Sequence, residues 1–236
     1  MSQTWSKADL HIHSDHSDGL PSVPEIMDHV QQKTDLSVIA ITDHNTLEGA
    51  LFAKSLEGLY DFEVIVGEEI SSTAGHIIGL FLQEDIRPGM SAADTLASIR
   101  EQDGIAVIPH PFANRAFGPF GLESVGDEIV ELDFNALETV NSSPYLVWAN
   151  RVAAKAHDDG AGAAAVGGSD SHVLRAIGTG YTLFAGSTAA DLRSAIEAET
   201  TRACLGKGQA AVALHYFVRF RRIRKLQAWN WERCRP

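Results

Sequence analysis

Residues 8–19 read ADLHIHSDHSDG, and this stretch decides how the rest of the chain is interpreted. It begins with the short apolar alternation of a β-strand and ends in polar residues and a glycine, where a loop is expected. His11 and His13 are two residues apart, so on a strand both imidazoles point to the same face. Asp18 adds a carboxylate just after the strand. One histidine on a strand suits a core residue held by hydrogen bonds, but two on one face followed by carboxylates favour metal ligands.

Later segments also place histidines or acids near the ends of predicted strands. They contribute His44 in TDHNT, Glu68 and Glu69 in GEEIS, His76 in GHIIG, His110 in IPHP, and Asp170 with His172 in GSDSH. Glu68 and Glu69 are adjacent, so only one of them can point to the inner face of a strand. Because the loops that follow the strands of a β/α barrel meet at one mouth, we expect these residues to form one site.

Short runs rich in Val, Ile and Leu alternate with amphipathic segments, which predicts an α/β fold of repeated β/α units around a parallel sheet. The predicted strands span residues 9–13, 37–42, 63–70, 76–82, 105–109, 136–140, 163–167 and 180–184. The predicted helices span residues 23–33, 92–102, 146–158 and 188–198. Ser91 and Ser187 precede two of these helices, and we expect their hydroxyls to accept unpaired N–H groups of the first turn.

Composition favours one soluble domain. The chain has 236 residues, of which 44% are hydrophobic, and a single α/β barrel commonly takes about 200–250 residues. The formal charge of −12 argues against a surface that coats nucleic acid, because phosphate neutralisation needs clustered Lys and Arg. Cys204 and Cys234 are too few for a disulfide framework or a Cys-rich zinc site, so a cytoplasmic location is expected. No apolar stretch is long enough to predict a membrane span.

The composition changes at the C-terminal end. Residues 215–236 contain seven basic residues against the single acid Glu232, a net charge of +6, so the preceding 214 residues carry −18. We therefore divide the chain into a domain at 1–214 and a basic tail at 215–236. Two interpretations of the tail stay open: a solvated cationic helix docked on the acidic body, or a weak contact with nucleic acid or anionic lipid.

The ordered motifs resemble those of the PHP (polymerase and histidinol phosphatase) family. The resemblance rests on DLHIHS with SDG, TDHNT, GEEIS with GHIIG, the His-Pro pair and GSDSH, and it extends from residue 8 to about residue 184. Residues 136–141 and 149–151 also look like those of short stand-alone members that resemble nucleotide phosphatases and 5′–3′ exonucleases. The resemblance implies a distorted barrel of seven β/α units, with a trinuclear metal site at the carboxyl ends of the strands.

The same resemblance implies a ligand set for three divalent ions. The first ion would take His11, His13, Glu69 and Asp170, the second Glu69, His76 and His110, and the third Asp18, His44 and His172. Glu69 is preferred to Glu68 because the family's bridging acid stands directly before an Ile-Ser pair. His and carboxylate ligands suit Mn, Zn or Fe, and the sequence does not select among them.

Paired cations bind a phosphoryl oxygen, activate water and neutralise the leaving oxygen, so no protein nucleophile is required. Catalytic roles are expected for Glu69, Asp170 and His172, the last two as donors of a proton to the leaving group. The substrate phosphate also needs fixed positive groups, for which Arg115 is the first candidate and Arg175 the second. His16, between His13 and Asp18, is a further candidate for substrate contact.

The remaining candidates have weaker assignments. Asn141 and Asn150 are lesser substrate candidates, and Asp43, which precedes the expected ligand His44, is expected to be a positioning carboxylate. His29, His157 and His215 are more typical of structural or solvated histidines.

Three functions remain open at this stage. A metal-dependent phosphoesterase acting on nucleotides or short oligonucleotides is favoured, because all the implied ligand positions hold competent residues. An amidohydrolase-like enzyme that cleaves C–N bonds is the first alternative, but no predicted strand offers the metal-bridging lysine of many such barrels, since Lys33 and Lys54 lie in or beside helices. A non-catalytic interaction module stabilised by metal is the second. Within phosphoesterases, phosphatase and exonuclease activity are not distinguished.

Overall fold

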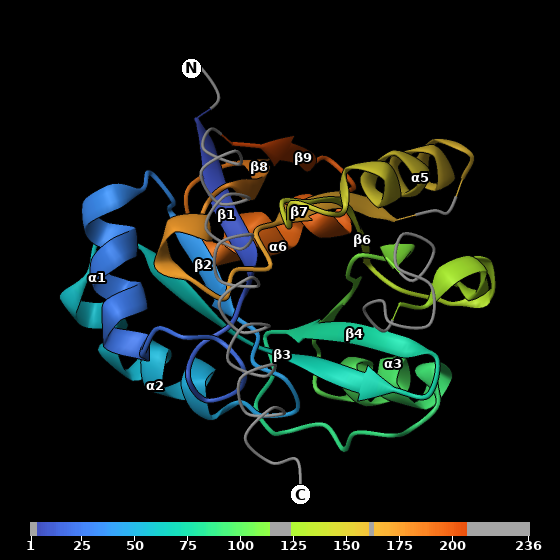
Figure 1. The fold of residues 1–236 in the computed structure, drawn as a ribbon, viewed down its shortest axis with the longest axis horizontal. Coiled ribbons are helices and arrows are strands. Elements are labelled where there is room, and N and C mark those ends of the chain that lie inside the picture. Colours follow the sequence, from blue (N-terminus) through green and yellow to red (C-terminus); the bar gives the residue numbers. More distant parts are fainter. Residues whose placement is uncertain (1–3, 114–123, 161–162, 207–236) are drawn as a thin grey trace, which may run out of the picture.

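One sheet carries all the strand ends that matter for the site (Figure 1). The computed structural model describes residues 4–113, 124–160 and 163–206. In these residues the strands are β1 (Trp5–Ile12), β2 (Val38–Ile41), β3 (Glu63–Ser72), β4 (Gly75–Leu80), β5 (Ile105–Ile108), β6 (Ala136–Asn141), β7 (Ala164–Gly168), β8 (Gly180–Ala185) and β9 (Arg202–Leu205). Their order in the sheet is β7-β6-β5-β4-β3-β2-β1-β8-β9.

The sheet curls until its ends nearly meet. β7 packs against β1, β8 and β9, although it stands at the far end of the strand order. The hydroxyl of Thr182 on β8 accepts a hydrogen bond from the Gly167 amide and donates one to the Gly167 carbonyl, both at 2.9 Å. A further isolated bridge pairs Ile12 with Ser171. The result is the nearly closed, distorted α/β barrel that the sequence predicts.

The strand pairing is mixed, which corrects the expectation of a sheet that is parallel throughout. β1, β2 and β3 are mutually parallel, as are β5, β6 and β7, but β4 is antiparallel to both of its neighbours. β8 is likewise antiparallel to β1 and to β9. The physical reason at β3 and β4 is the length of their connection: only residues 73–74 join them, and so short a turn can connect only antiparallel strands.

The helices lie outside the sheet (Figure 1). They are α1 (Val23–Lys33), α2 (Glu48–Leu56), α3 (Ala92–Glu101), α5 (Val147–Asp158) and α6 (Ala189–Glu197), with the short 3₁₀ turns η1 (Glu57–Leu59), η3 (Gly126–Glu131) and η4 (Leu174–Ala176). In the described parts of the chain, no helix has both the length and the apolar character needed to cross a membrane.

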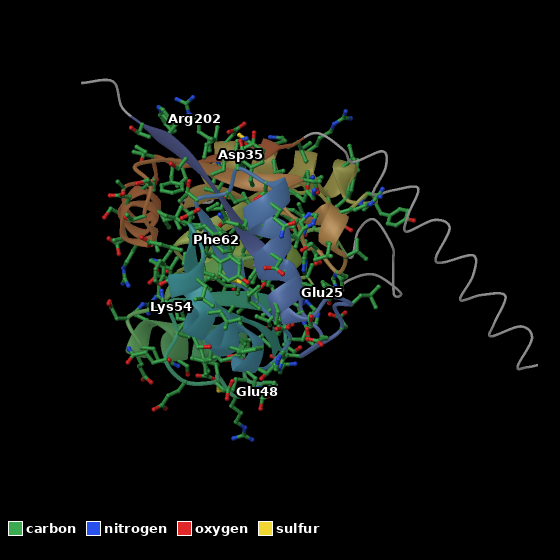
Figure 2. All side chains as sticks on the ribbon, turned by 90° about the vertical axis from the view of Figure 1, so that its left-hand side faces the viewer. Glu25, Asp35, Glu48, Lys54, Phe62 and Arg202 are labelled. Atoms are coloured by element: carbon green, nitrogen blue, oxygen red, sulfur yellow. The ribbon has the colours of Figure 1, made fainter. Side chains whose placement is uncertain are left out.

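Helix α1 shows how local sequence fixes an element and its buried face. Glu25 accepts hydrogen bonds from the amide and the hydroxyl of Ser22, which holds the start of the helix. The side chains of Val23, Ile26, Met27 and Val30 recur with helical spacing and pack in one cluster with strand β2. Figure 2 shows the opposite, outer side of α1 and α2, where Glu25, Glu48 and Lys54 are labelled.

Helix α6 closes the end of the barrel opposite the site. The Ala189 amide donates to Glu63 at the start of β3, and the Arg193 guanidinium donates to the Asp103 carbonyl just before β5. Leu192 and Ile196 are buried in the same cluster as Ile65 of β3 and Val166 of β7. The carboxyl ends of the parallel strands are therefore at the open end, where the candidate site lies.

The cap of helix α6 differs from the sequence prediction, whereas that of α3 agrees with it. Ser91 accepts a hydrogen bond from the Asp94 amide, as expected. At α6 the cap is Thr188 rather than Ser187: the Thr188 hydroxyl accepts from the Asp191 amide at 3.1 Å, and the Asp191 carboxylate accepts from the Thr188 amide at 3.1 Å. The reciprocal pair favours Thr188 because its partner lies three residues ahead, in the register of a capping box.

This arrangement predicts different effects for two neighbouring substitutions. Thr188→Ala should lower the free energy of unfolding by about 1 kcal/mol, because it removes the acceptor for the Asp191 amide. Ser187→Ala is the matched control and should change it by less than roughly 0.5 kcal/mol, since Ser187 is exposed and only its amide is bonded to Asp191. Urea denaturation measures both, and an equal or larger loss for Ser187→Ala would contradict the assignment.

Candidate metal centre

The residues expected to be ligands come together at the open end of the barrel. Four overlapping groups have potential ligand atoms within 4.8 Å of one another, and between them they include all nine expected residues: His13, Asp18, His44 and His172; His11, Glu69 and His110; His11, His13 and Asp170; and His44, Glu69 and His76. These residues come from the ends of six strands and their loops. The arrangement follows from the parallel strands, whose carboxyl ends lie at one edge.

Glu69 lies at the middle of the cluster. Its Oε2 is 3.3 Å from Nε2 of both His11 and His13 and 3.3 Å from Nδ1 of His44. Its Oε1 is 3.0 Å from Nδ1 of His76 and 3.0 Å from Nε2 of His110. One buried carboxylate therefore faces five imidazoles, with each oxygen turned toward a different set.

Burial and the surrounding charge shift the pKa of the Glu69 carboxyl in opposite directions. Burial alone would raise the pKa of its carboxyl, but positive charge on His11 and His76 and the hydrogen bonds from His11 and His110 hold that pKa well below its usual range. The ionised carboxylate thus depends on positive charge around it, and divalent ions would supply such charge.

The neighbouring Glu68 points away from the cluster. Its Oε2 accepts a hydrogen bond from the Ile86 amide at 2.9 Å, and burial raises the pKa of its carboxyl to about 7. The structure therefore places Glu69, and not Glu68, on the inner face, as the alternation of side chains along a strand requires.

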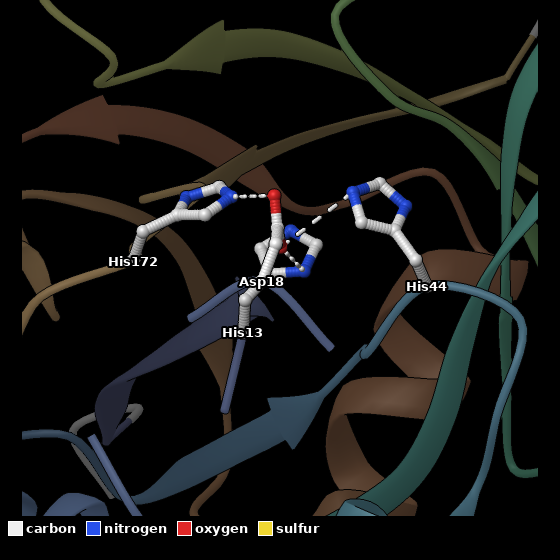
Figure 3. Close-up of side chains that lie close together, drawn as sticks. All are labelled: His13, Asp18, His44 and His172. Carbon is white, nitrogen blue, oxygen red and sulfur yellow. Dashed lines mark hydrogen bonds and ion pairs between the residues drawn. The ribbon is translucent and has the colours of Figure 1, made fainter. Parts of the chain in front are cut away.

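The group around Asp18 is more accessible than the other three groups. Figure 3 shows His13, His44 and His172 arranged around the Asp18 carboxylate. Asp18 Oδ2 is 3.0 Å from His172 Nε2, and its Oδ1 is 3.7 Å from His13 Nδ1 and 3.8 Å from His44 Nε2. Burial opposes ionisation of Asp18, yet the hydrogen bond from His172 and the charges of the histidines lower the pKa of its carboxyl to about 2. Burial also opposes the charge on His172, but the bond to Asp18 and the charge of Asp170 raise the pKa of its imidazole to about 9.

The potential ligand atoms of the cluster are arranged more as metal ligands than as hydrogen-bond partners of one another. His13 is fully buried, and neither of its ring nitrogens has a hydrogen-bond partner; Nδ1 of His110 is likewise unpaired. His13 Nε2 nevertheless lies 3.3 Å from Glu69 Oε2 and 3.4 Å from Asp170 Oδ1. Two ligand atoms that each lie about 2.0–2.1 Å from one ion in tetrahedral geometry are about 3.3 Å apart. Buried, unpaired nitrogens at such separations are what a metal centre requires.

Asp43 holds the loop that returns Asp18 to the cluster. Its carboxylate accepts hydrogen bonds from the amide of Ser14 at 2.7 Å and from the hydroxyls of Ser14 and Ser17, each at 2.6 Å. A Cβ atom at Gly49 would lie 2.2 Å from Asp43 Oδ2, so helix α2 leaves room for this carboxylate only with glycine at that position. These contacts agree with the expectation that Asp43 positions its surroundings.

The expected substrate residues are not gathered in the same way. Arg115 lies outside the described residues. Arg175, on η4, is exposed and lines a groove of about 840 Å³ with Lys7 and Lys33, and the residues that line this groove do not include the nine expected ligands. His16 is exposed in the loop after β1, with Nδ1 3.5 Å from Glu48 of helix α2.

Two other histidines of the described residues, His29 and His157, lie within helices α1 and α5, as expected. The ring of His157 is bonded through Nε2 to the Ala163 carbonyl. His215 lies outside the described residues.

Asn141 and Asn150 serve the scaffold rather than an open surface. The Asn150 side chain accepts from the Asn141 amide at 3.0 Å and donates to the Asn141 carbonyl at 2.7 Å. The Asn141 side chain donates to Glu138 at 2.9 Å and to Asp170 at 3.2 Å. These bonds tie helix α5 to strand β6, and strand β6 to the cluster.

Two buried acids, Glu138 and Asp9, were not among the sequence candidates. Glu138 is bonded to His11, His110 and Asn141, whereas Asp9 accepts from the amides of His11, Ser169 and Gly178. Burial raises the pKa of Asp9 to about 6. The available signal was an acid inside a predicted strand, because a buried acid must be paired or bonded.

Comparison with known proteins gives two family matches and several relatives. Residues 9–108 match the PHP domain and residues 148–201 match the PHP-associated region. An uncharacterized protein of Methanocaldococcus jannaschii is 40% identical over 147 residues, 58% of this chain and 82% of that protein. A 5′–3′ exoribonuclease of Haemophilus influenzae is 27% identical over 233 residues, 95% of this chain and 76% of that protein.

Among solved structures, the chain resembles a two-domain protein of Bacteroides vulgatus that contains a predicted PHP-like metal-dependent phosphoesterase. The TM-score is 0.69 at 19% identity, and the match covers 86% of this chain and 65% of that one. The chain thus spans slightly less than two thirds of that protein, and the likeness concerns the fold.

The geometry around Glu69 predicts the effect of one substitution on metal content. Of the three ions that the sequence predicts, Glu69→Gln should lose the two that would share this carboxylate and retain the one beside Asp18, because the neutral amide removes the charge and one of the two acceptor oxygens. Glu68→Gln is the matched control: the same change, one residue away, leaves the cluster untouched and should keep wild-type metal content. Elemental analysis after metal loading and gel filtration measures both. Loss of metal from Glu68→Gln alone would contradict the assignment.

Proposed function

The chain belongs to the PHP family, and from this premise we propose that it is a metal-dependent phosphoesterase that hydrolyses phosphate esters of nucleotides or short oligonucleotides. The observation that carries the proposal is the convergence of nine His, Asp and Glu residues on overlapping groups centred on Glu69. We propose three divalent ions, of Mn, Zn or Fe. Two of the four overlapping groups contain Glu69 and another contains Asp18, which supports two ions that share Glu69 and a third beside Asp18.

The protein would hold the ions through side chains that are already placed. His11, His13, Glu69 and Asp170 would hold the first ion, Glu69, His76 and His110 the second, and Asp18, His44 and His172 the third. When bound, such ions polarise the phosphoryl oxygens and lower the pKa of water so that hydroxide forms near neutral pH. No protein nucleophile is then needed.

The residues of the chain have the remaining tasks. Glu69, through its two oxygens, would keep two of the ions at a fixed separation. Of the two residues expected to give a proton to the leaving oxygen, His172 would do so when it does not bind the third ion. Burial opposes ionisation of Asp170, yet the positive charge of His11 holds the pKa of its carboxyl well below its usual range, so Asp170 would act as a ligand. His172 Nε2 already shares a hydrogen bond with Asp18 at 3.0 Å, which keeps the imidazole oriented at the mouth of the site. Arg115 and Arg175 would bind the non-reacting oxygens of the phosphate.

Short nucleotide substrates fit the charge of the protein. Its formal charge of −12 repels long polyanions, so binding must be concentrated at the metal centre. The similarity to a protein named as a 5′–3′ exoribonuclease supports a nucleotide or oligonucleotide rather than another phosphate ester. A mononucleotide phosphatase and a 5′–3′ exonuclease would use the same centre and differ in how the rest of the substrate is held.

The alternative of an amidohydrolase-like enzyme is less well supported. Strand β1 begins at Trp5, so Lys7 lies on a strand, in contrast to the sequence prediction. Its Nζ is bonded to Asp35 at 2.6 Å and lies over the ring of Tyr181, so it does not reach the cluster. The groups of potential ligands in the described residues are built from histidines and carboxylates only. An interaction module without catalysis has no need for this complete set.

The function is tested with a panel of nucleoside monophosphates, nucleoside bisphosphates and short 5′-phosphorylated oligonucleotides, each assayed with Mn, Zn and Mg added separately. We expect phosphate or mononucleotide release that depends on added Mn or Zn and stops with a chelator. Cleavage of amide substrates in place of phosphate esters would favour the amidohydrolase. A protein that binds metal but turns over neither class would favour the interaction module.

A prediction on the two arginines separates substrate binding from metal binding. Arg115→Ala or Arg175→Ala should lower kcat/KM on the best substrate by about tenfold to a hundredfold, the worth of a charged hydrogen bond to phosphate. Metal content should not change. Arg100→Ala is the control, because Arg100 is paired with Asp133 on the outer surface. Full activity in either arginine variant would remove that residue from the site.

A further inference from the structure

Glu138 of strand β6 lies beside the proposed centre but outside its ligand set. The side chain is 2% exposed and reaches three elements of the barrel. Its Oε1 is 3.1 Å from His11 Nδ1, and its Oε2 accepts hydrogen bonds from the His110 amide at 2.7 Å and from the Asn141 side chain at 2.9 Å. We propose that Glu138 is a positioning residue that prepares His11 and His110 to bind metal. The inference rests on the proposed metal centre.

At His11, Glu138 fixes which ring nitrogen faces the cluster. A carboxylate only accepts, so the bond from Nδ1 places the proton of the neutral imidazole on that nitrogen. When His11 binds metal, the proton that leaves is therefore the one on Nε2, which is otherwise bonded to Glu69 Oε2 at 3.3 Å and lies 3.6 Å from Asp170 Oδ1. A histidine that binds metal commonly donates its other N–H to a carboxylate in this way, which sets both the tautomer and the ring orientation.

At His110, Glu138 holds the backbone rather than the ring. His110 has a φ of 29°, a left-handed conformation that a residue with a Cβ atom adopts rarely. The bond from its amide to Glu138 stabilises this turn at the end of β5. This turn places His110 Nε2 at 3.0 Å from Glu69 Oε1. The same carboxylate therefore positions ligands on two different strands.

Asn141 extends the network to a third ligand. Its side-chain amide donates to both Glu138 and Asp170. His11, His110 and Asp170 are members of the two groups deepest in the barrel, and all three connect to Glu138 directly or through Asn141. The loop that carries Asp18 is held instead by Asp43, so the ion at the mouth should depend less on Glu138.

A glycine on the neighbouring strand β7 leaves space for the contact between His11 and Glu138. A Cβ atom at Gly168 of β7 would lie 2.7 Å from Glu138 Oε1 and 2.6 Å from the Cβ of His11. Any larger residue at Gly168 would push the bonded pair apart. Glycine at position 168 therefore lets strand β7 approach closely without disturbing the hydrogen bond between His11 and Glu138.

The test is Glu138→Gln in the full chain, titrated with Zn²⁺ by calorimetry in a chelator-buffered solution. One amide oxygen can accept from His11 or from His110 and Asn141, but not from both sides, so the two deep ions should bind about 10- to 100-fold more weakly. The ion at the mouth should change by only a few fold. Glu68→Gln is the control, since that buried acid is bonded to the Ile86 amide and should leave all affinities unchanged.

A second readout follows the proton on His11 without any turnover assay. In the Zn²⁺-loaded wild type, the ¹H–¹⁵N spectrum of the histidine rings should show His11 protonated at Nδ1, and this signal should shift or broaden in Glu138→Gln. Circular dichroism of the metal-free proteins checks folding. If Glu138→Gln does not fold, Glu138→Asp keeps the charge but is too short to reach both His11 and His110, and it should weaken the same two ions.

Two outcomes are distinguished. Wild-type affinities together with an unchanged His11 signal in a folded Glu138 variant would overturn the positioning role and leave the proposed function standing. A wild-type protein that binds no Zn²⁺ would overturn the metal centre itself.

Discussion

The centre depends on one buried carboxylate that must stay ionised. Glu69 is 1% exposed, and its two oxygens face imidazoles of five histidines at 3.0–3.3 Å. A charge removed from water is costly unless opposite charge surrounds it. The histidines, and the cations that they would hold, meet this requirement. The two oxygens of Glu69 can face their separate sets of imidazoles only if the five rings approach from different directions. The strands that carry these histidines must therefore surround Glu69.

The barrel meets that constraint through its mixed pairing. Parallel strands deliver His11, His13 and Asp170 to one end, whereas His76 comes from the antiparallel strand β4. The tight β3–β4 hairpin sets His76 opposite Ser71, two residues beyond Glu69. A strictly parallel sheet would have brought β4 back only after a long crossover. Around this set, Asp43 holds the outer loop and Glu138 connects β1, β5 and β6. The cluster is therefore supported by acids that do not themselves reach its centre.

The sequence predicts the parts of this account that depend on local pattern. The spacing of His11 and His13 predicts that both share the inner face, and alternation predicts that only one of Glu68 and Glu69 does. The resemblance to the PHP family selects Glu69, and the structure brings the expected ligands together. Helix α2 was not predicted, because its N-cap position is Leu47, whose amide is bonded to Asp85 far along the chain. Glu138 was missed for the same reason, because its partners His11 and His110 are distant in sequence. Local patterns locate ligands, whereas the contacts that orient them arise only when the chain is folded.

The most direct test of the central claim is anomalous diffraction from crystals of the protein loaded with Mn²⁺. We expect three anomalous peaks at the open end of the barrel, two of them beside Glu69 and the third beside Asp18. A single peak, or peaks that are not bound to Glu69, would contradict a three-ion centre built on this carboxylate.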